Sequence, residues 1–320
     1  MVTRLPNPLR PPQATEDFVF SFYIPSSVRE SLPEKGMVLP KLSHMESGIR
    51  ACINAVDESI KIQREQNDGV ILTIPKDDQH VMVLSTGRCG TMSLTHLLYD
   101  TNLTPYHEYW WVVEAPHRHE MQARIQSAYF NDLSCANAWV STRAVEWMGA
   151  SLSNKPLVAL NHLDTIFAPV FAALHQKSRF VWLKRDAESV FKSFYGKGQW
   201  NSGQLKPIQF SFNPFRYADG GYDLIPALAW YVYFTEVFIQ SFKTVVGDRL
   251  LEINSEDLFM CDRDTIGLFL DFIGSDVSVE HAIDHFKKPI NEKSHRLWCD
   301  QNQIEEATQY FKSEMERIKF

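Results

Sequence analysis

The sequence predicts an α/β fold with a mainly parallel central sheet flanked by helices. Short apolar runs of strand type, such as residues 81–84 and 179–184, alternate with longer stretches whose apolar residues recur at helical spacing. This alternation is typical of βαβ units, whose crossover helices cover both faces of a parallel sheet. The composition agrees, because 44% hydrophobic and 22% charged residues suit a globular protein and 320 residues provide an ample core.

We expect a flexible proline-rich arm over residues 1–16 and a single domain over residues 17–320. The arm lacks the apolar core of a signal peptide, and no later segment is apolar enough to cross a bilayer. The five cysteines are scattered and form no C-x-x-C pair, which argues against a disulfide framework or a zinc site. A net charge of −7 argues against a nucleic-acid partner. Together these features indicate a cytoplasmic protein that binds neither membrane nor nucleic acid, and they leave its oligomeric state open.

The expected elements follow the periodicity of the chain. In the first half we expect strands at 17–24, 69–74 and 81–84, a helix from the capping box at 43–46 to about residue 66, a helix from 91, a return along the sheet at 104–111, and two helices within 117–150. In the second half we expect strands at 157–161, 179–184 and 249–253, a helix capped by Asp164 that reaches about His175, a helix after Asp186, a long helix over 226–246, and helices towards the C-terminus.

Residues 80–100, HVMVLSTGRCGTMSLTHLLYD, read as a buried strand, a glycine turn and a helix. Such a turn points backbone N–H groups at its contents, and the helix N-terminus adds partial positive charge. The stretch therefore predicts an anion cradle for a phosphate or a sulfate ester. Its candidate binding residues are Ser85, Thr86, Gly87, Arg88, Cys89, Gly90, Thr91, Met92 and Ser93. The plain alternative is an ordinary connection between a strand and a capped helix.

The turn is not a Walker motif, because Gly90 is followed by Thr91 and not by lysine. Hydrolysis of ATP or GTP is therefore disfavoured, and so is a metal ion held at this turn. The cation of the turn is instead Arg88, which comes earlier.

A second basic site follows the strand at 179–184. Arg185 lies at the end of that strand, where open α/β sheets bind ligands, and Ser193 lies about two helical turns later on the same face. An arginine fork with a hydroxyl suits a terminal phosphate. The alternative is that Arg185 only pairs with Asp186 or Glu188 at the surface.

Together these segments resemble the sulfotransferases that use 3′-phosphoadenosine 5′-phosphosulfate (PAPS). STGRCGTMSL is similar to the family's first motif, in the form of the bacterial and Golgi-type branch, and RFVWLKRDAESVFKSFY is similar to the second. LLEINSEDL resembles a third segment, with Ser255 where a tyrosine is frequent. The resemblance implies a P-loop NTPase-like sulfotransferase fold and PAPS as the cofactor, with PAP (3′-phosphoadenosine 5′-phosphate) as the product and no metal. It also implies that the cradle binds the 5′-phosphosulfate, with Arg88 on the sulfuryl group, and that Arg185 and Ser193 bind the 3′-phosphate.

Sulfuryl transfer also needs a general base for the acceptor. Glu108 lies in a segment where the tyrosylprotein-type and several bacterial sulfotransferases carry a glutamate base, and we favour it slightly. His162 lies in LVALNHLD, which is similar to the segment that carries the histidine base of the cytosolic branch. His107 is a weaker third choice. Arg88 is a fixed cation, so we expect it to stabilise charge and not to donate a proton.

The acceptor pocket is expected in the aromatic-rich insertions at about 109–150 and 196–225. The predicted function is transfer of the sulfuryl group from PAPS to a hydroxyl or amine of a small-molecule acceptor. The alternatives are a carbohydrate or glycolipid sulfotransferase, an atypical P-loop kinase, and a non-catalytic module that binds PAP or another nucleotide.

Overall fold

The computed structural model describes residues 79–107, 155–196, 224–288 and 300–319, together with eight helical positions between residues 46 and 58. The elements, in chain order, are β1 (Val81–Leu84), α3 (Thr91–Leu98), β2 (Thr104–Tyr106), β3 (Leu157–Ala159), the 3-10 helix η1 (His162–Phe167), α7 (Ala168–Leu174), β4 (Arg179–Lys184), α8 (Ala187–Tyr195), α9 (Leu224–Val246), the 3-10 helix η4 (Gly247–Arg249), β5 (Leu250–Asn254), α10 (Ser255–Phe259), α11 (Arg263–Ile273), α12 (Val279–Phe286) and α13 (Gln301–Lys319).

The five described strands form one parallel sheet in the order β2-β3-β1-β4-β5. The chain leaves β1 for the far edge at β2, returns through β3, and then crosses β1 to reach β4 and β5. The strand order therefore reverses at β1, which pairs with β3 on one side and with β4 on the other. A reversal of this kind opens a crevice at the carboxyl ends of the strands, where α/β proteins bind ligands.

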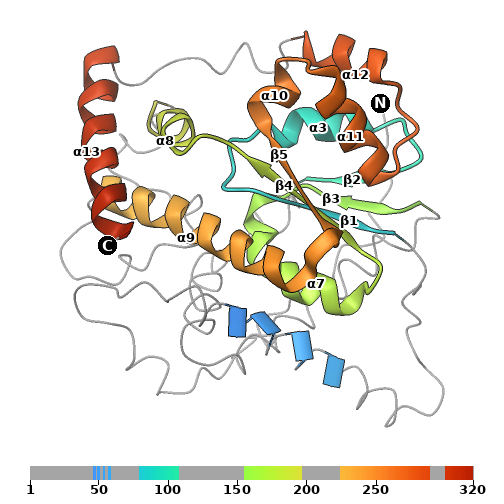
Figure 1. Ribbon diagram of the computed structural model, residues 1–320. Helices are drawn as coiled ribbons and strands as arrows, with labels where there is room; N and C mark the ends of the chain where they lie inside the picture. Colours follow the sequence, from blue (N-terminus) through green and yellow to red (C-terminus); the bar gives the residue numbers. More distant parts are fainter. Residues whose placement is uncertain are drawn as a thin grey trace, which may run out of the picture.

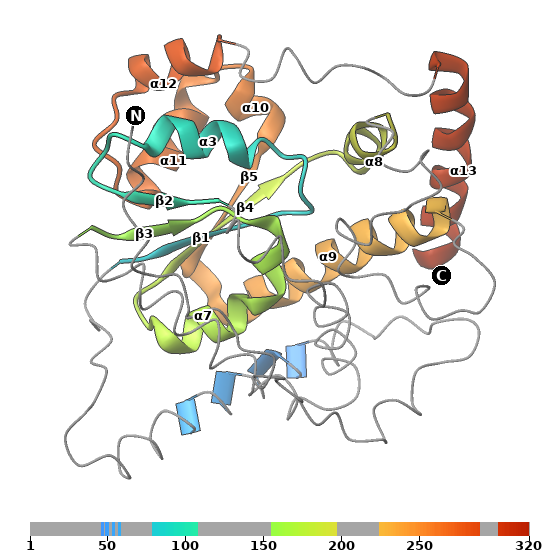
Figure 2. The ribbon, with the colours of Figure 1, turned by 180° about the vertical axis from the view of Figure 1, so that it is seen from behind.

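Helices cover both faces of the sheet (Figures 1 and 2). One face carries α3 together with α10, α11 and α12, and the opposite face carries α7 and α9. At the carboxyl edge of the sheet, α13 packs against both α8 and the first part of α9 (Figure 1). The α/β class with a parallel sheet flanked by helices is thereby confirmed.

The central strands are apolar because both of their faces are covered. Every residue of β1 is buried, as are the inner four residues of β4. On the α7–α9 face, the Phe180 ring stands edge-on to Phe171 and Phe242, with centroids 6.1 and 4.8 Å away. Large fully buried rings of this kind make the core rigid, so the strand ends hold a defined geometry at the carboxyl edge.

Most predicted elements in the described ranges are present, with small shifts at their ends. β1 and β4 have the predicted bounds, and β3 and β5 differ from prediction by one or two residues. The prediction that Asp164 caps a helix is wrong. A 3-10 turn begins earlier, at His162, and the Asp164 N–H donates to the Asn161 carbonyl at 2.9 Å, so Asp164 lies buried inside the first turn.

Several other predictions lie outside the described residues. These are the arm at 1–16, the strands at 17–24 and 69–74, the helices within 117–150, and most of the two insertions at 109–150 and 196–225. In the predicted helix at 43–66, the eight described positions are helical. The single domain over 17–320 stays a prediction. Among the described residues, no helix is long and apolar enough to cross a membrane.

His175 is a buried histidine at the amino-end side of the sheet, far in sequence from the cradle. Its ring lies 4.5 Å from that of His80 and 4.8 Å from that of Phe171, measured between centroids. Burial, and to a smaller extent the neighbouring His80, lowers the pKa of His175 to about 3. The folded protein therefore keeps this imidazole neutral under conditions in which the unfolded chain protonates it.

We predict that His175 makes the fold acid-sensitive. Below the ordinary histidine pKa of about 6.5, His175 becomes protonated in the unfolded chain but stays neutral in the folded chain. The free energy of unfolding therefore falls as the pH falls towards 3. Between pH 7.5 and 5, the free energy of unfolding of the natural protein should drop by roughly 1–2 kcal/mol more than that of His175→Phe. Urea unfolding at the two pH values measures this, and equal drops in both proteins would contradict it.

Candidate functional site

The candidate site lies where the carboxyl ends of the strands meet. All five strands are parallel, so the segments that follow them emerge at one edge of the sheet. Ser85 follows β1 and His107 follows β2 directly, and His162 is the third residue after β3. Arg185 follows β4 and α10 follows β5 directly. Residues from every strand end therefore border one region, with the turn after β1 at its centre.

The turn after β1 is anchored to the 3-10 helix η1. The Ser85 N–H donates to Thr165 Oγ1 at 3.1 Å, and the same hydroxyl donates to the Ser85 carbonyl at 3.1 Å. The Gly87 N–H then donates to Ser85 Oγ at 3.2 Å, which closes the first part of the turn. These bonds are buried, so the entry to the turn has little freedom to move.

The rest of the turn has left-handed backbone at Gly87, Arg88 and Gly90, with φ values of 81°, 61° and 87°. Gly90 is the N-cap of α3 and provides no side chain to cap it. The first-turn N–H groups of α3 therefore face the turn without a side-chain cap, and they carry the partial positive charge of the helix N-terminus. We call Ser85–Ser93 the anion cradle.

Two buried groups support the cradle from inside the protein. The Tyr231 hydroxyl, on α9, donates to the Thr86 carbonyl at 2.7 Å. The Cys89 thiol donates to the Gly87 carbonyl at 3.1 Å, and burial raises the pKa of this thiol to about 11. Since the thiolate is the nucleophilic form, Cys89 is an inert packing residue at neutral pH and not a reactive thiol.

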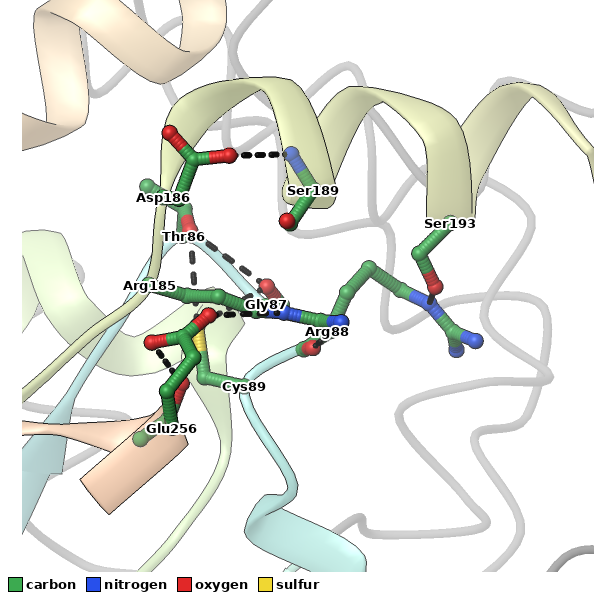
Figure 3. A network of polar contacts seen from close by, with 10 residues as sticks. Thr86, Gly87, Arg88, Cys89, Arg185, Asp186, Ser189, Ser193 and Glu256 are labelled. Carbon is green, nitrogen blue, oxygen red and sulfur yellow. Dashed lines mark hydrogen bonds and ion pairs between the residues drawn. The ribbon is translucent and has the colours of Figure 1, made fainter. Parts of the chain in front are cut away.

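Arg88 joins the cradle to the second basic motif. Its Nε donates to Ser193 Oγ at 3.1 Å across a sequence separation of 105 residues (Figure 3). Its guanidinium also lies over the Phe194 ring, 5.9 Å from the centroid. The two motifs that the sequence separates are thus parts of one site.

Arg185 turns towards the cradle and not towards its neighbours on α8 (Figure 3). Its Nη1 donates to the Arg88 carbonyl at 2.5 Å, and its Nε lies 3.5 Å from Oε1 of Glu256. Asp186 and Glu188, the two nearby carboxylates that the sequence offers as partners for Arg185, bind other groups. Asp186 accepts from the Ser189 N–H as the N-cap of α8, and Glu188 pairs with Lys192 and Lys312. Arg185 therefore pairs with neither Asp186 nor Glu188, and its ion-pair partner is the partly exposed Glu256.

Two of the three candidate bases, His162 and His107, lie within the described residues. The His162 ring lies against Gly87, because a Cβ placed on Gly87 would meet His162 Cδ2 at 2.7 Å. Glu108 lies outside the described residues, although the residue before it is described. His107 Nε2 lies 2.9 Å from Thr91 Oγ1, so the segment after β2 reaches the start of α3.

Sequence reasoning missed the residues that hold the cradle from other elements. Thr165 and Tyr231 bond its backbone, Phe259 packs on Gly90, and Glu256 pairs with Arg185. Only Glu256 carried a signal, since it lies in the SEDL segment, which resembles the third motif. His285 Nε2 also lies 3.0 Å from the Ser93 carbonyl, and burial lowers the pKa of this histidine. Among the described residues, no group of three or more His, Cys, Asp or Glu side chains is placed to hold a metal ion.

Comparison with solved structures finds sulfotransferases whose folds are similar to that of this chain. No protein-family model matches the sequence, and no curated protein matches it significantly. The sulfotransferase domain from the olefin synthase of Synechococcus PCC 7002 is 13% identical with a TM-score of 0.42, covering 77% of this chain and 96% of that chain. The sulfotransferase domain from the curacin biosynthetic pathway is 15% identical with a TM-score of 0.42, covering 75% and 96% respectively. For the sulfotransferase STF9 from Mycobacterium avium the values are 10% identity, a TM-score of 0.41, and coverage of 79% and 81%. These identities and TM-scores are low.

We predict that Gly90→Ala lowers the free energy of unfolding by more than the strain of its positive φ alone would. The new Cβ would lie 2.2 Å from the Phe259 ring, whereas at Gly274, which also has a positive φ of 71°, nothing lies within 4 Å. Gly274→Ala should cost about 1 kcal/mol of stability from backbone strain, and Gly90→Ala should cost about 1–3 kcal/mol more from overpacking.

Urea unfolding measures both variants, and the Phe259→Ala background separates the clash from the strain. Removal of the ring should bring the cost of Gly90→Ala close to that of Gly274→Ala. Equal costs in the two backgrounds would show that the Phe259 contact does not constrain Gly90.

Proposed function

We propose that this chain is a PAPS-dependent sulfotransferase that transfers the sulfuryl group to a hydroxyl or amine of a small-molecule acceptor and releases PAP. The observation that carries the proposal is the Arg88–Ser193 hydrogen bond, because it joins two anion-binding motifs into one site of two parts. A nucleotide with anionic groups on both the 5′ and the 3′ position of its ribose matches that arrangement. PAPS has such groups and supplies an activated sulfuryl group when bound.

The residues present fit such a donor. The first turn of α3 and the cradle N–H groups suit the 5′-phosphosulfate, with Thr91 and Ser93 adding hydroxyls. Ser193 and Arg185 suit the 3′-phosphate, since a guanidinium and a hydroxyl are strong donors to phosphate oxygens. We assign the Arg88 guanidinium to the charge that develops as the sulfuryl group leaves, a role for which it must exchange Ser193 for the transferring group. No lysine occupies the Walker position, which favours this donor over ATP with Mg²⁺.

His162 is our preferred general base, in place of Glu108, which the sequence motifs slightly favour. A neutral imidazole accepts a proton readily near pH 7, and the contact of the His162 ring with Gly87 supports a position beside the reacting group. Glu108 remains the second candidate, because its neighbour His107 reaches Thr91.

Ligand stabilisation tests the donor. We predict that PAP raises the thermal unfolding midpoint without any metal, whereas ATP with Mg²⁺ does not, because ligands that bind the folded state stabilise it. A response to ATP with Mg²⁺ alone would favour the atypical kinase. PAP binding without PAPS turnover across a panel of metabolites and saccharides would favour the non-catalytic module. A panel response confined to sugars would favour the carbohydrate sulfotransferase.

Paired variants test the base. We predict that His162→Asn lowers sulfation turnover by about 10²–10⁴-fold, since proton abstraction is lost, while the affinity for PAP changes little. Glu108→Gln is the matched comparison. Loss of turnover in Glu108→Gln alone would move the base to Glu108, and near-normal turnover in both variants would refute both assignments.

A further inference from the structure

Arg185 contacts the backbone of the cradle, not only the space expected for a ligand. Its Nη1 donates to the Arg88 carbonyl at 2.5 Å. Arg88 is one of two described non-glycine residues with positive φ, at 61°. Left-handed backbone is unfavourable for a residue with a Cβ, so it persists where surrounding contacts hold it. The Arg185 guanidinium is such a contact.

The direction of the Arg88 carbonyl also sets the direction of the next N–H group. A trans peptide is planar, so its N–H points opposite to its carbonyl. With the Arg88 carbonyl turned to Arg185, the Cys89 N–H is fixed on the other side of the same peptide plane. Arg185 therefore helps to determine where a cradle donor points.

Glu256 holds Arg185 in this position from the other side (Figure 3). Its Oε1 lies 3.5 Å from Arg185 Nε, and its Oε2 accepts from the Ser255 hydroxyl at 3.2 Å. Ser255 and Glu256 belong to α10, the short helix whose Phe259 also packs on Gly90. Two side chains of α10 thus act on the cradle, one by direct packing and one through Arg185.

We propose that Arg185 is a positioning residue for the cradle as well as a ligand of the donor's 3′-phosphate, and that Glu256 keeps it on the Arg88 carbonyl. The two ends of the donor site then share one side chain, so the affinities for the two anionic groups are coupled. Loss of Arg185 weakens binding even of a nucleotide that has no 3′-phosphate. The identity of the ligands rests on the proposed function, whereas the support of the cradle by Arg185 does not.

Hydrogen exchange of the ligand-free protein tests the backbone role without any nucleotide. Deuterium uptake is measured in peptides that cover residues 84–91, whose Ser85 and Gly87 N–H groups are hydrogen-bonded. Arg185→Ala should increase this uptake, and Arg185→Lys, which keeps a donor but not the fork, should increase it less. Arg317→Ala is the matched control, because Arg317 is well exposed and pairs with Glu314 on its own helix. Uptake that is unchanged in Arg185→Ala would overturn the proposal.

Calorimetry gives the second measurement, the affinities of the natural protein and its variants for PAP and for adenosine 5′-phosphosulfate. Adenosine 5′-phosphosulfate lacks the 3′-phosphate, so a residue that only binds that phosphate leaves its affinity unchanged. We expect Arg185→Ala to weaken this ligand by about tenfold, in keeping with the loss of a charge-assisted hydrogen bond. Glu256→Gln should weaken it by about threefold, because a half-exposed ion pair contributes modestly. Glu316→Gln, at an exposed position of α13, is the matched control and should have no effect.

The outcomes separate this inference from the proposed function. If the natural protein binds neither nucleotide, the proposed function fails, and the exchange data still decide the role of Arg185. If the natural protein binds both nucleotides and Arg185→Ala weakens only PAP, the proposed function stands and the coupling is refuted. Thermal unfolding of each variant confirms that it is folded, and Arg185→Lys serves where Arg185→Ala does not fold.

Discussion

The parallel pairing of β1 with β4 is the constraint on which the candidate site depends. The register places Leu84, the last residue of β1, beside Trp182, so the turn after β1 begins next to the final residues of β4. That alignment lets Arg185 reach the Arg88 carbonyl and lets Ser193, on the helix that follows β4, receive the Arg88 side chain. An antiparallel pair would send the two segments to opposite edges of the sheet, and neither contact could form.

The cradle combines a buried frame with charges that remain accessible to solvent. Thr165 and Tyr231 bond its backbone from within the protein, while the Arg185–Glu256 pair is about one third to one half exposed, at 32% and 44%. The buried hydrogen bonds gain strength from their low-dielectric surroundings and fix the geometry. The exposed charges are attenuated by water and salt, so an incoming phosphate can exchange partners with them at little cost. This division suits a site that must be preformed in shape and still bind and release a multiply charged ligand.

The sequence predicted what local patterns encode and missed what distant segments supply. The apolar runs that became β1 and β4 were recognisable because buried parallel strands read as continuous hydrophobic stretches. Arg88, Arg185 and Ser193 were recognisable because they stand at fixed positions within two short motifs. The structure brings these three residues together. Tyr231 gave no signal, because a hydroxyl in an apolar helix looks like any other core aromatic until the Thr86 carbonyl is placed beside it. The error at Asp164 has a similar origin, since an acidic residue before an apolar run looks like an N-cap whether or not a 3-10 turn has already begun.

The strand order also bears on where an acceptor would approach under the proposed function. Arg185 and Ser193 lie on the β4 side of β1, so a donor held by them at its 3′-phosphate extends from that side into the cradle. The opposite side of β1 is bordered by the segments after β3 and β2, which bring His162 to Gly87 and His107 to Thr91. In-line displacement requires the attacking atom to lie opposite the leaving phosphate. An acceptor that enters from the β2–β3 side satisfies this requirement, and it meets the candidate bases there, whereas Arg185 lies on the other side of β1. Under the proposed function, donor binding and proton abstraction would therefore lie on opposite sides of a single strand.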